Sequence, residues 1–299
     1  MKKFFTIICT LALVFVSVFS FVGCTNDDLD SVLDTNTTFT YVHLLNNSTG
    51  FTTDPNETSI SIGVRKGEAL LPQINDALDT LTDEFRNNLM RSMVDFKKSS
   101  ENTFTPGTNA EIIESNEEFR VAMECGYEPF NWTQNNSSNG AVPISGISGK
   151  YANGYDVQIA RIVANALGRK LVIVQYDWES LLEGLKSNTF DAIIAGMSPT
   201  NERKEEIDFS NYYYTSPLVI ITKEGSRLAT ATSLIDIDKS GIKIAAQPGT
   251  SHLTLLTEQT HNCTVISNLE DFPAMRIALE AGTIDGYVAE EPTAMALIK

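Results

Sequence analysis

The sequence predicts an α/β protein with two lobes, built on mixed but mostly parallel sheets. From Phe119 onward, short apolar runs alternate with segments whose apolar residues recur every three to four positions, a pattern typical of β–α–β units. The chain has 299 residues, of which 42% are hydrophobic and 20% charged. That length and composition suffice for one large or two ordinary globular domains.

The amino terminus is expected to be a secretion signal rather than part of the fold. Two lysines precede an apolar run that ends at Val22, as in a signal peptide, although the run would also suit a transmembrane helix. The motif FVGC, ending at Cys24, resembles a bacterial lipobox with phenylalanine in place of the usual leucine. We expect residues 1–23 to be a lipoprotein signal peptide and Cys24 to be lipidated, since two acyl chains anchor stably. Residues 24–37 then form a polar tether.

The next part of the chain predicts two strands, two helices and a linker. The β-rich runs Phe39–Leu45 and Ser59–Val64 are separated by turn residues. Leu70–Leu81 and Phe85–Phe96 each place their apolar residues on one helical face. The polar stretch Lys98–Asn116 is expected to be a linker.

The rest of the chain predicts alternating strands and helices. Expected strands are Phe119–Met123, Leu171–Gln175, Ala192–Ala195, Leu218–Thr222, Lys243–Ala246, Val265–Ser267 and Gly286–Val288. One expected helix begins at Asp156, which caps it, and ends at Gly168. The other expected helices are Trp178–Lys186, one that follows Thr200, one that begins near His252, Ala274–Ala281 and Pro292–Lys299. Thr133–Asn153, rich in Ser, Asn and Gly, is expected to be a loop, and Lys223–Ser226 a crossing between lobes.

Charge and cysteine usage exclude several classes of function. A net charge of −16 disfavours binding to nucleic acid or to an anionic membrane surface by charge. Cys9 would leave with the signal, and Cys125 and Cys263 lie in segments expected in different lobes, so we expect two free thiols. The three histidines are scattered. We therefore expect neither a metal nor a cofactor.

The stretch from Asp191 to Ser210 predicts a receptor for a carboxylate. A buried strand ends at Ala195, and Gly196 allows the backbone to turn. Ser198 and the residues after it are typical of a helix start, and Arg203 lies in the first turn of that helix. Exposed backbone N–H groups, hydroxyls and a guanidinium then meet at the end of one strand. The alternative is an arginine in solvent beside neighbouring glutamates.

Three motifs together carry a family resemblance. AGMSPTNERKEEIDFSNYYY, GYEPFNW and GYDVQIARIVANALG resemble the solute-binding proteins of polar amino-acid ABC transporters, from about residue 37 onward. The resemblance implies the type II periplasmic-binding-protein fold, a two-lobed clamshell. It also implies a monomer that is anchored through its lipid on the extracytoplasmic membrane face and delivers its ligand to an ABC transporter permease. The chain has no phosphate-binding GxxxxGK[ST] loop, so we expect the ATPase to be another chain.

The resemblance also implies which residues contact the amino acid. The expected contacts are Glu124, Tyr127, Trp178, Ala195, Gly196, Ser198, Arg203, Gln247, Thr250, Ser251 and Glu290. Arg203 would bind the α-carboxylate, together with Thr250 and Ser251 from the second lobe, although Ser251 could equally be a helix cap. Glu290, one methylene longer than the usual aspartate, would bind the ammonium group with the Gly196 carbonyl and the Ser198 hydroxyl.

The side chain of the ligand is expected to lie between aromatic walls. Tyr127 and Trp178 match the stacking positions of the family, although either could belong to the core. Glu124 and Gln247 match the distal end of the ligand. Aromatic faces with carboxylates favour a cation, by about 0.5–2 kcal/mol for a cation–π contact. This favours lysine or arginine, with glutamine close behind.

The order of the elements differs from that of the family and predicts a circular permutation. In the family the chain continues after the equivalent of Gly286–Val288 and its helix. The further strands and helices found there resemble residues 39–96 of this chain, which we call the amino-terminal block. The expected division is 38–55 in lobe II, 56–97 in lobe I, 98–117 as permutation linker, 118–222 as main lobe I and 223–299 as main lobe II. The alternative is that residues 37–97 are the tail of a lost tandem copy.

Two other functions remain as alternatives. One is an enzyme on the same fold, similar to cyclohexadienyl dehydratase, with Glu124 or Glu290 as acid or base. No nucleophile–base pair accompanies them in the sequence, so no catalytic residue is expected. The other is a ligand-sensing domain of a receptor, for which the sequence contains no output module.

Overall fold

The computed structural model describes residues 37–44, 51, 52, 54–99, 103–107, 111 and 113–298. The expected signal peptide, Cys24 and the tether up to residue 36 lie outside these residues. Within the described part, every helix is too short or too polar to cross a bilayer. Cys125 and Cys263 are not joined by a disulfide, as predicted.

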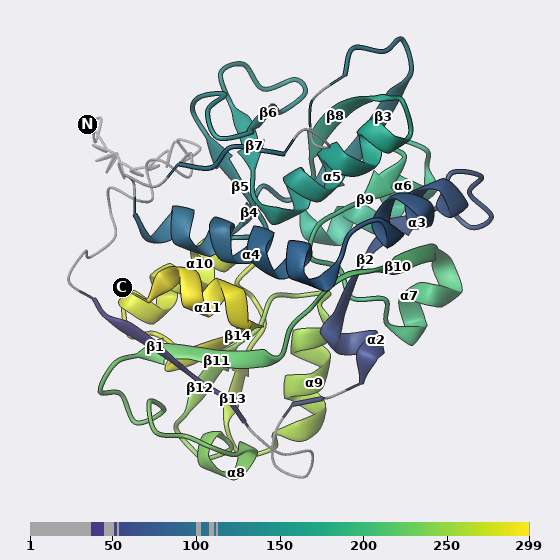
Figure 1. Cartoon of the computed structure of the whole chain (residues 1–299). Coiled ribbons are helices and arrows are strands. Elements are labelled where there is room, and N and C mark those ends of the chain that lie inside the picture. Colours follow the sequence, from purple (N-terminus) through teal and green to yellow (C-terminus); the bar gives the residue numbers. More distant parts are fainter. Residues whose placement is uncertain are drawn as a thin grey trace, which may run out of the picture.

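Lobe I, in the upper half of Figure 1, contains a five-stranded sheet. Its strands run in the order β10 (Asp208–Thr215), β2 (Ser59–Val64), β9 (Ala192–Ile193), β3 (Glu118–Met123) and β8 (Lys170–Gln175). β3 pairs in parallel with β8 and β9, whereas β2 pairs antiparallel with β9 and β10. Every residue of β2 is buried because this strand is paired on both sides.

Lobe II, in the lower half of Figure 1, has a second five-stranded sheet of the same design. Its strands run in the order β1 (Phe39–Val42), β11 (Leu218–Lys223), β14 (Gly286–Glu290), β12 (Lys243–Ala245) and β13 (Thr264–Ile266). β12 pairs in parallel with β13 and β14, and β11 pairs antiparallel with β14 and β1. Both sheets are therefore mixed. They are less parallel than predicted, because every antiparallel pair involves a strand next to a crossing between the lobes.

A small third sheet begins before the segment that was expected to be a loop, Thr133–Asn153, and extends through it. Its strands are β4 (Gly126–Tyr127), β5 (Asn131–Gln134), β7 (Tyr151–Asn153) and β6 (Val142–Pro143). The prediction of an unstructured Thr133–Asn153 is wrong in this respect. Strands of two to four residues, joined by turns rich in Ser, Asn and Gly, are too short to show a hydrophobic period.

Most helices lie close to where the sequence predicts them, but the two short helices Pro55–Thr58 and Leu234–Ile237 were not predicted. They are α2 (Pro55–Thr58), α3 (Leu71–Asp79), α4 (Asp83–Lys98), α5 (Tyr155–Ala166), the 3₁₀ turn η2 (Trp178–Ser180), α6 (Leu181–Lys186), α7 (Asn201–Glu206), α8 (Leu234–Ile237), α9 (Ser251–Gln259), α10 (Phe272–Glu280) and α11 (Glu291–Leu297). One cap differs: Gly154 precedes α5, and Asp156 lies inside the helix, fully buried. Its carboxylate accepts hydrogen bonds from Tyr213 and Asn131 instead.

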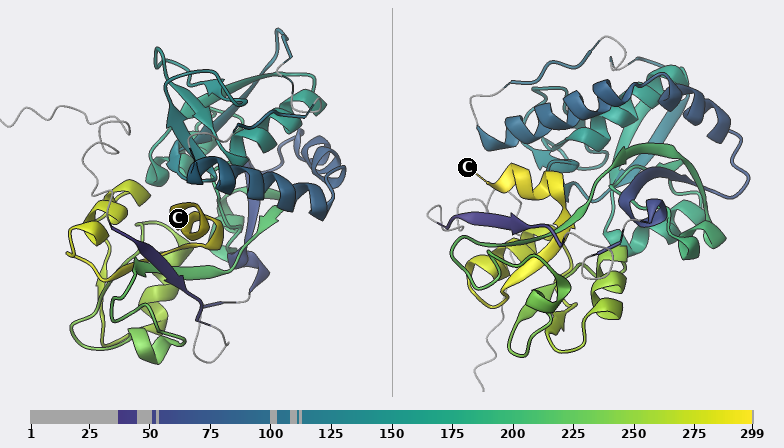
Figure 2. Two further views of the ribbon diagram at one scale, coloured as in Figure 1. Left: turned by 60° about the vertical axis from the view of Figure 1, so that its left-hand side comes forward. Right: turned by 60° about the horizontal axis from the view of Figure 1, so that its bottom comes forward.

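Two segments carry the chain between the lobes (Figure 2). The first leads from β1 in lobe II to β2 in lobe I. The second leads from β10 to β11 through Ser216 and Pro217. The crossing therefore lies before the expected Lys223–Ser226, because Leu218–Lys223 already pairs with both β1 and β14.

The hydrophobic core continues from one lobe into the other. The larger cluster fills lobe I and reaches lobe II through Phe272, Met275 and Tyr287. A smaller cluster, which includes Ile244 and Leu256, is confined to lobe II. Helix α4 of lobe I also contacts α11 of lobe II. The lobes are thus in direct apolar contact around the site described next.

Candidate functional site

All the predicted contact residues line one small cavity between the lobes. Those lining it are Glu124, Tyr127, Trp178, Ala195, Gly196, Ser198, Arg203, Gln247, Thr250, Ser251 and Glu290, together with His252 and Phe272, which were not predicted. The cavity has room of about 20 Å³, about that of a single water molecule. A larger molecule can enter only when the residues of lobe I and those of lobe II move apart.

Arg203 is a buried cation whose guanidinium, among the described residues, donates hydrogen bonds only to backbone carbonyls. The hydroxyl of Thr200 caps α7 by accepting from the Arg203 N–H, which sets the start of this helix. The guanidinium donates to the Ser198 carbonyl at 2.8 Å and, across the lobes, to the Gly249 carbonyl at 3.0 Å. Its central carbon lies 5.2 Å from the centroid of the Trp178 ring. Burial lowers the pKa of Arg203 to about 10, so the group remains charged at neutral pH.

No carboxylate of the described residues forms an ion pair with Arg203. A buried charge that only carbonyl groups offset is costly unless an ion of opposite sign joins it. Since α7 has only six residues, its dipole adds little and the guanidinium supplies most of the attraction. The geometry therefore suits a carboxylate, which a guanidinium can bind through two parallel hydrogen bonds.

The turn beside Arg203 is held from behind by a buried network. Gly196 has φ of 66°, and a Cβ there would lie 3.0 Å from the Tyr127 ring. Its N–H donates to the Tyr213 hydroxyl at 3.3 Å, and that hydroxyl donates to Asp156 Oδ1 at 2.7 Å. Burial raises the pKa of Asp156 to about 6, although the hydrogen bonds from Tyr213 and Asn131 lower it. The network fixes the path of the backbone that faces the cavity.

The amino-terminal block holds the same turn from the other side. The Ser198 hydroxyl donates to the carbonyl oxygen of Glu57 at 3.0 Å, and the N–H of Ser61 donates to the Met197 carbonyl at 3.0 Å. The hydroxyl proton of Ser198 is therefore committed. Its oxygen can still accept a hydrogen bond from a ligand.

The second lobe contributes a strand-to-helix turn. Thr250 caps α9: its hydroxyl accepts from the N–H of Leu253 and donates to the Gln247 carbonyl at 2.6 Å. The cap that was considered for Ser251 is therefore Thr250, and Ser251 is the buried first residue of the helix. The Gly249 carbonyl accepts from Trp178 Nε1 at 3.0 Å as well as from Arg203. This one oxygen joins two side chains of lobe I to lobe II.

Glu290 is a buried carboxylate with an unused oxygen. His252 Nε2 lies 3.0 Å from its Oε1, and neither Glu290 Oε2 nor His252 Nδ1 has a partner among the described residues. Burial lowers the pKa of His252 to about 3 and raises that of Glu290 to about 8. The imidazole is therefore neutral at pH 7, and the direction of its hydrogen bond with Glu290 depends on the imidazole tautomer.

Glu124 is a second carboxylate at the same cavity. It accepts from Gln247 Nε2 across the lobes at 2.7 Å. Burial raises the pKa of Glu124 to about 8 against this hydrogen bond, and Asp271 and Asp177 add to the rise. Both carboxylates are thus destabilised in their ionised form unless a cation lies beside them.

An aromatic stack closes another wall. The Tyr127 ring lies between Phe130, at a centroid distance of 4.9 Å, and Phe272 of lobe II, at 4.0 Å. The Tyr127 hydroxyl is buried and has no hydrogen-bond partner in the described part of the chain. A flat or aliphatic chain can pack against these faces while polar groups at its ends meet the charges.

The chain matches a known family over its central half. Bacterial extracellular solute-binding proteins, family 3, match residues 119–276. The chain belongs to this family. The location of this solute-binding protein is accordingly extracytoplasmic.

Individual relatives agree with the family assignment. A probable histidine-binding protein of Campylobacter jejuni is 29% identical over 204 residues, 67% of this chain and 70% of that protein. An amino acid ABC transporter substrate-binding protein of Streptococcus pneumoniae, solved with L-arginine bound, has a TM-score of 0.52 at 28% identity and covers 63% of this chain and 73% of that chain. The ancestral amino acid-binding protein AncCDT-1, a precursor of cyclohexadienyl dehydratase, has a TM-score of 0.51 at 27% identity. The match covers 59% of this chain and 71% of that chain.

These similarities establish the predicted type II periplasmic-binding-protein fold for this solute-binding protein. Other curated relatives are named as arginine- or cystine-binding proteins. For several curated relatives this chain spans less than two thirds of their length, 32% in one case and 54% in another.

Two residues of the cavity in this solute-binding protein escaped sequence reasoning. His252 directly follows Ser251, which was predicted to contact the ligand. Its place at the same helix start could therefore have indicated that it also lines the cavity. Phe272 follows Asp271, which caps α10, and the sequence contains no indication that this helix start faces the other lobe.

Proposed function

We propose that this solute-binding protein captures a polar amino acid with a cationic side chain, and that lysine or arginine is favoured over glutamine. The observation that carries the proposal is the joint burial of one unpaired guanidinium, Arg203, and two carboxylates, Glu124 and Glu290, around one cavity. With His252 neutral, these three groups sum to one negative charge when both carboxylates are ionised. An amino acid with a cationic side chain carries one net positive charge and balances it.

Each charge of the ligand has a counterpart of suitable chemistry. The α-carboxylate takes the place of the Gly249 carbonyl on Arg203, because an anion is a stronger acceptor than a neutral carbonyl. The ammonium group binds the free Oε2 of Glu290, with the Ser198 oxygen as a further acceptor. The aliphatic part of the side chain packs on Tyr127 and Trp178, and its cationic end reaches Glu124.

Closure of the lobes follows from the same contacts. Gly249 and Gln247 of lobe II bond to Trp178, Arg203 and Glu124 of lobe I. A ligand that contacts both lobes favours the closed arrangement by its differential binding energy. The closed protein then docks on an ABC transporter permease. The arginine-bound structural relative supports this ligand class.

A thermal-shift screen over the twenty standard amino acids tests the proposal. A ligand at one hundred times its Kd adds about 2.7 kcal/mol to the free energy of unfolding. For a protein of this size that corresponds to a rise in Tm of about 5–10 °C. We expect arginine or lysine to give the largest rise. Equal or larger rises with aspartate or glutamate would contradict the charge argument.

The alternative enzymatic function has one observation in its favour. The raised pKa values of Glu124 and Glu290, both about 8 and both caused chiefly by burial, would suit a general acid. The precursor relationship of AncCDT-1 to a dehydratase is compatible with it. Turnover of prephenate or arogenate by the purified protein would support the enzyme and contradict simple capture.

We also propose that Cys24 carries the lipid anchor. The lipobox-like sequence before it supports this proposal. Replacing Cys24 by Ser should release the protein from the membrane fraction into the medium or the soluble extract. Unchanged membrane association of this variant would contradict lipid anchoring at this residue.

The chain order is proposed to be a circular permutation. The amino-terminal block supports this, because β2 lies between β9 and β10 in lobe I while β1 forms the edge of the lobe II sheet. Helix α11 contacts β1, and the two lie side by side in Figures 1 and 2. A rearranged chain of residues 117–298, a short glycine-serine linker and residues 38–98 should fold and bind with similar affinity. If residues 37–97 are the remnant of a tandem copy, the rearranged chain should lose binding.

A further inference from the structure

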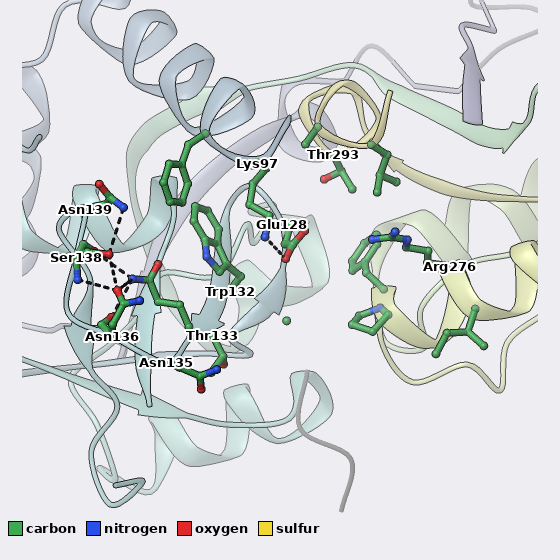
Figure 3. A pocket seen from close by; sticks show the side chains of 18 of the residues that line it. Lys97, Glu128, Trp132, Thr133, Asn135, Asn136, Ser138, Asn139, Arg276 and Thr293 are labelled. Atoms are coloured by element: carbon green, nitrogen blue, oxygen red, sulfur yellow. Dashed lines mark hydrogen bonds and ion pairs between the residues drawn. The ribbon is translucent and has the colours of Figure 1, made fainter. Parts of the chain in front are cut away.

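A second and larger cavity lies between the lobes, beside the amino-acid site (Figure 3). It measures about 520 Å³, and its walls come from α4 and the β4–β5 region of lobe I and from α10, β14 and α11 of lobe II. The two cavities share Phe272. One face of the Phe272 ring stacks on Tyr127, so the second cavity and the amino-acid site share an aromatic wall.

Arg276 supplies this cavity with hydrogen-bond donors that are still free. Its Nε donates to Glu280 Oε1 at 3.2 Å, and its two terminal nitrogens have no hydrogen-bond partner among the described residues. Figure 3 shows the guanidinium directed toward Glu128 across the cavity. No ion pair joins these two groups in the described structure. The terminal nitrogens can therefore donate hydrogen bonds to an acceptor in the cavity.

Glu128 does not compete for this guanidinium. Its Oε1 lies 2.6 Å from Lys97 Nζ, and the ammonium group of Lys97 lies 5.0 Å from the centroid of the Trp132 ring. Lys97 therefore offsets the charge of Glu128. Arg276 itself forms an ion pair with Glu280 through Nε, and only its terminal nitrogens lack a hydrogen-bond partner among the described residues.

Thr293 gives an independent indication of a ligand. The residue is 5% exposed, lines the cavity, and its hydroxyl has no hydrogen-bond partner in the described structure. A buried hydroxyl without a partner is costly. Thr293 comes from α11 and Arg276 from α10, so both groups belong to the lobe II wall of the cavity (Figure 3).

The remaining walls suit an apolar body. Phe96 and Trp132 stack on one another at a centroid distance of 5.8 Å, and Phe272 and Tyr287 face them from lobe II. Aromatic faces of this kind pack against flat or branched hydrocarbon groups. Convergent polar groups on mainly apolar walls are the usual composition of a small-molecule site.

We propose that this cavity binds an organic monocarboxylate with a ring or branched apolar body. The carboxylate is held by the terminal nitrogens of Arg276 and the hydroxyl of Thr293, and the body lies between Trp132 and Phe272. The site is separate from amino-acid capture and does not depend on the identity of the amino acid. Because its walls come from both lobes, its ligand favours the closed arrangement and raises the affinity for the amino acid, and the reverse holds equally.

Binding of 4-fluorophenylacetate, followed by fluorine NMR on the full chain, tests the proposal. We expect wild-type protein to bind the probe. Arg276→Gln should weaken binding about tenfold or more, since it removes a charge-assisted pair. Thr293→Val should weaken it about threefold through the loss of one hydrogen bond.

Two control variants separate this site from other arginines. Arg91→Gln, at an exposed position of α4, should leave probe binding unchanged. Arg203→Gln should also leave probe binding unchanged while it weakens amino-acid binding about 30-fold or more. Loss of probe binding in Arg203→Gln but not in Arg276→Gln would overturn the proposal, because the probe would then occupy the amino-acid site. So would the absence of binding to wild-type protein. If Arg276→Gln is unfolded by circular dichroism, unchanged binding in Thr293→Val overturns the proposal.

Discussion

The guanidinium of Arg203 reaches across the cleft to the carbonyl oxygen of Gly249, 3.0 Å away. The same oxygen accepts the indole N–H of Trp178. The two lobes are thus held at one point by bonds to a neutral acceptor, next to a cavity too small for an amino acid. The carboxylate of a ligand can therefore replace the Gly249 carbonyl on Arg203 when the lobes open and close again.

Replacing Trp178 by Phe should weaken closure without disturbing either lobe. The ring face is retained, but the hydrogen bond to Gly249 is lost, and such bonds contribute about 0.5–1.5 kcal/mol. We expect amino-acid affinity to fall about two- to tenfold in calorimetry, with an unchanged circular dichroism spectrum. Trp132→Phe, which alters the other tryptophan, is the matched control. An affinity equal to that of the wild type would show that the interlobe bond does not contribute.

Amino-acid binding should release protons and strengthen as the pH rises toward 8. The pKa values of Glu124 and Glu290 are raised by burial from 4.5 to about 8. Between these values the folded carboxyls hold protons that the unfolded ones have lost, so the free energy of unfolding falls as pH rises through this window. A cationic ligand favours the ionised carboxylates and displaces the protons. Calorimetry of arginine binding at pH 7 in buffers of different ionisation enthalpy measures the number of protons released. Binding without proton release would contradict the account.

Glu124→Gln should change which amino acid is preferred. The amide keeps the size of the side chain and removes the charge that faces the distal end of the ligand. We expect affinity for arginine and lysine to fall about tenfold or more, while affinity for glutamine changes little. The measurement is the ratio of the two affinities by calorimetry. A fall of equal size for all three ligands would instead mean that Glu124 supports the fold of the site.

Tyr213→Phe should loosen the turn that faces the ligand. The change removes one of the two side-chain donors to Asp156 and the hydroxyl that accepts from the Gly196 N–H, a loss of about 1–3 kcal/mol. Urea denaturation should report this loss, and amino-acid affinity should fall as well. Tyr212→Phe is the matched control, since the Tyr212 side chain is about half exposed. Equal stability of the two variants would contradict the role of the network.

Local patterns in the sequence predict much of the candidate site. The turn at Gly196, the helix start after Ser198 and the position of Arg203 are set within a few residues of chain, so they can be recognised without tertiary information. The contact between His252 and Glu290 cannot be recognised in this way, because it depends on how α9 packs against β14. The burial that shifts the pKa of both groups arises only from that packing.

The clearest omission in the fold prediction is β10. Its sequence, DFSNYYYT, carries a register irregularity between Phe209 and Tyr212 and another between Tyr212 and Tyr214. Irregularities of this kind interrupt the two-residue period by which a strand is recognised. Because β10 was missed, the crossing between the lobes was placed one strand too late.

Calorimetric titration of L-arginine or L-lysine into wild-type and Arg203→Gln protein tests the central claim most directly. The claim is that buried charges of this chain are matched to the charges of a free amino acid. We predict that Arg203→Gln lowers the affinity by about 2–5 kcal/mol, about 30-fold to several thousand-fold, while Lys204→Gln on the exposed side of the same helix does not. An Arg203→Gln variant that is folded and binds within about threefold of the wild type would contradict the account.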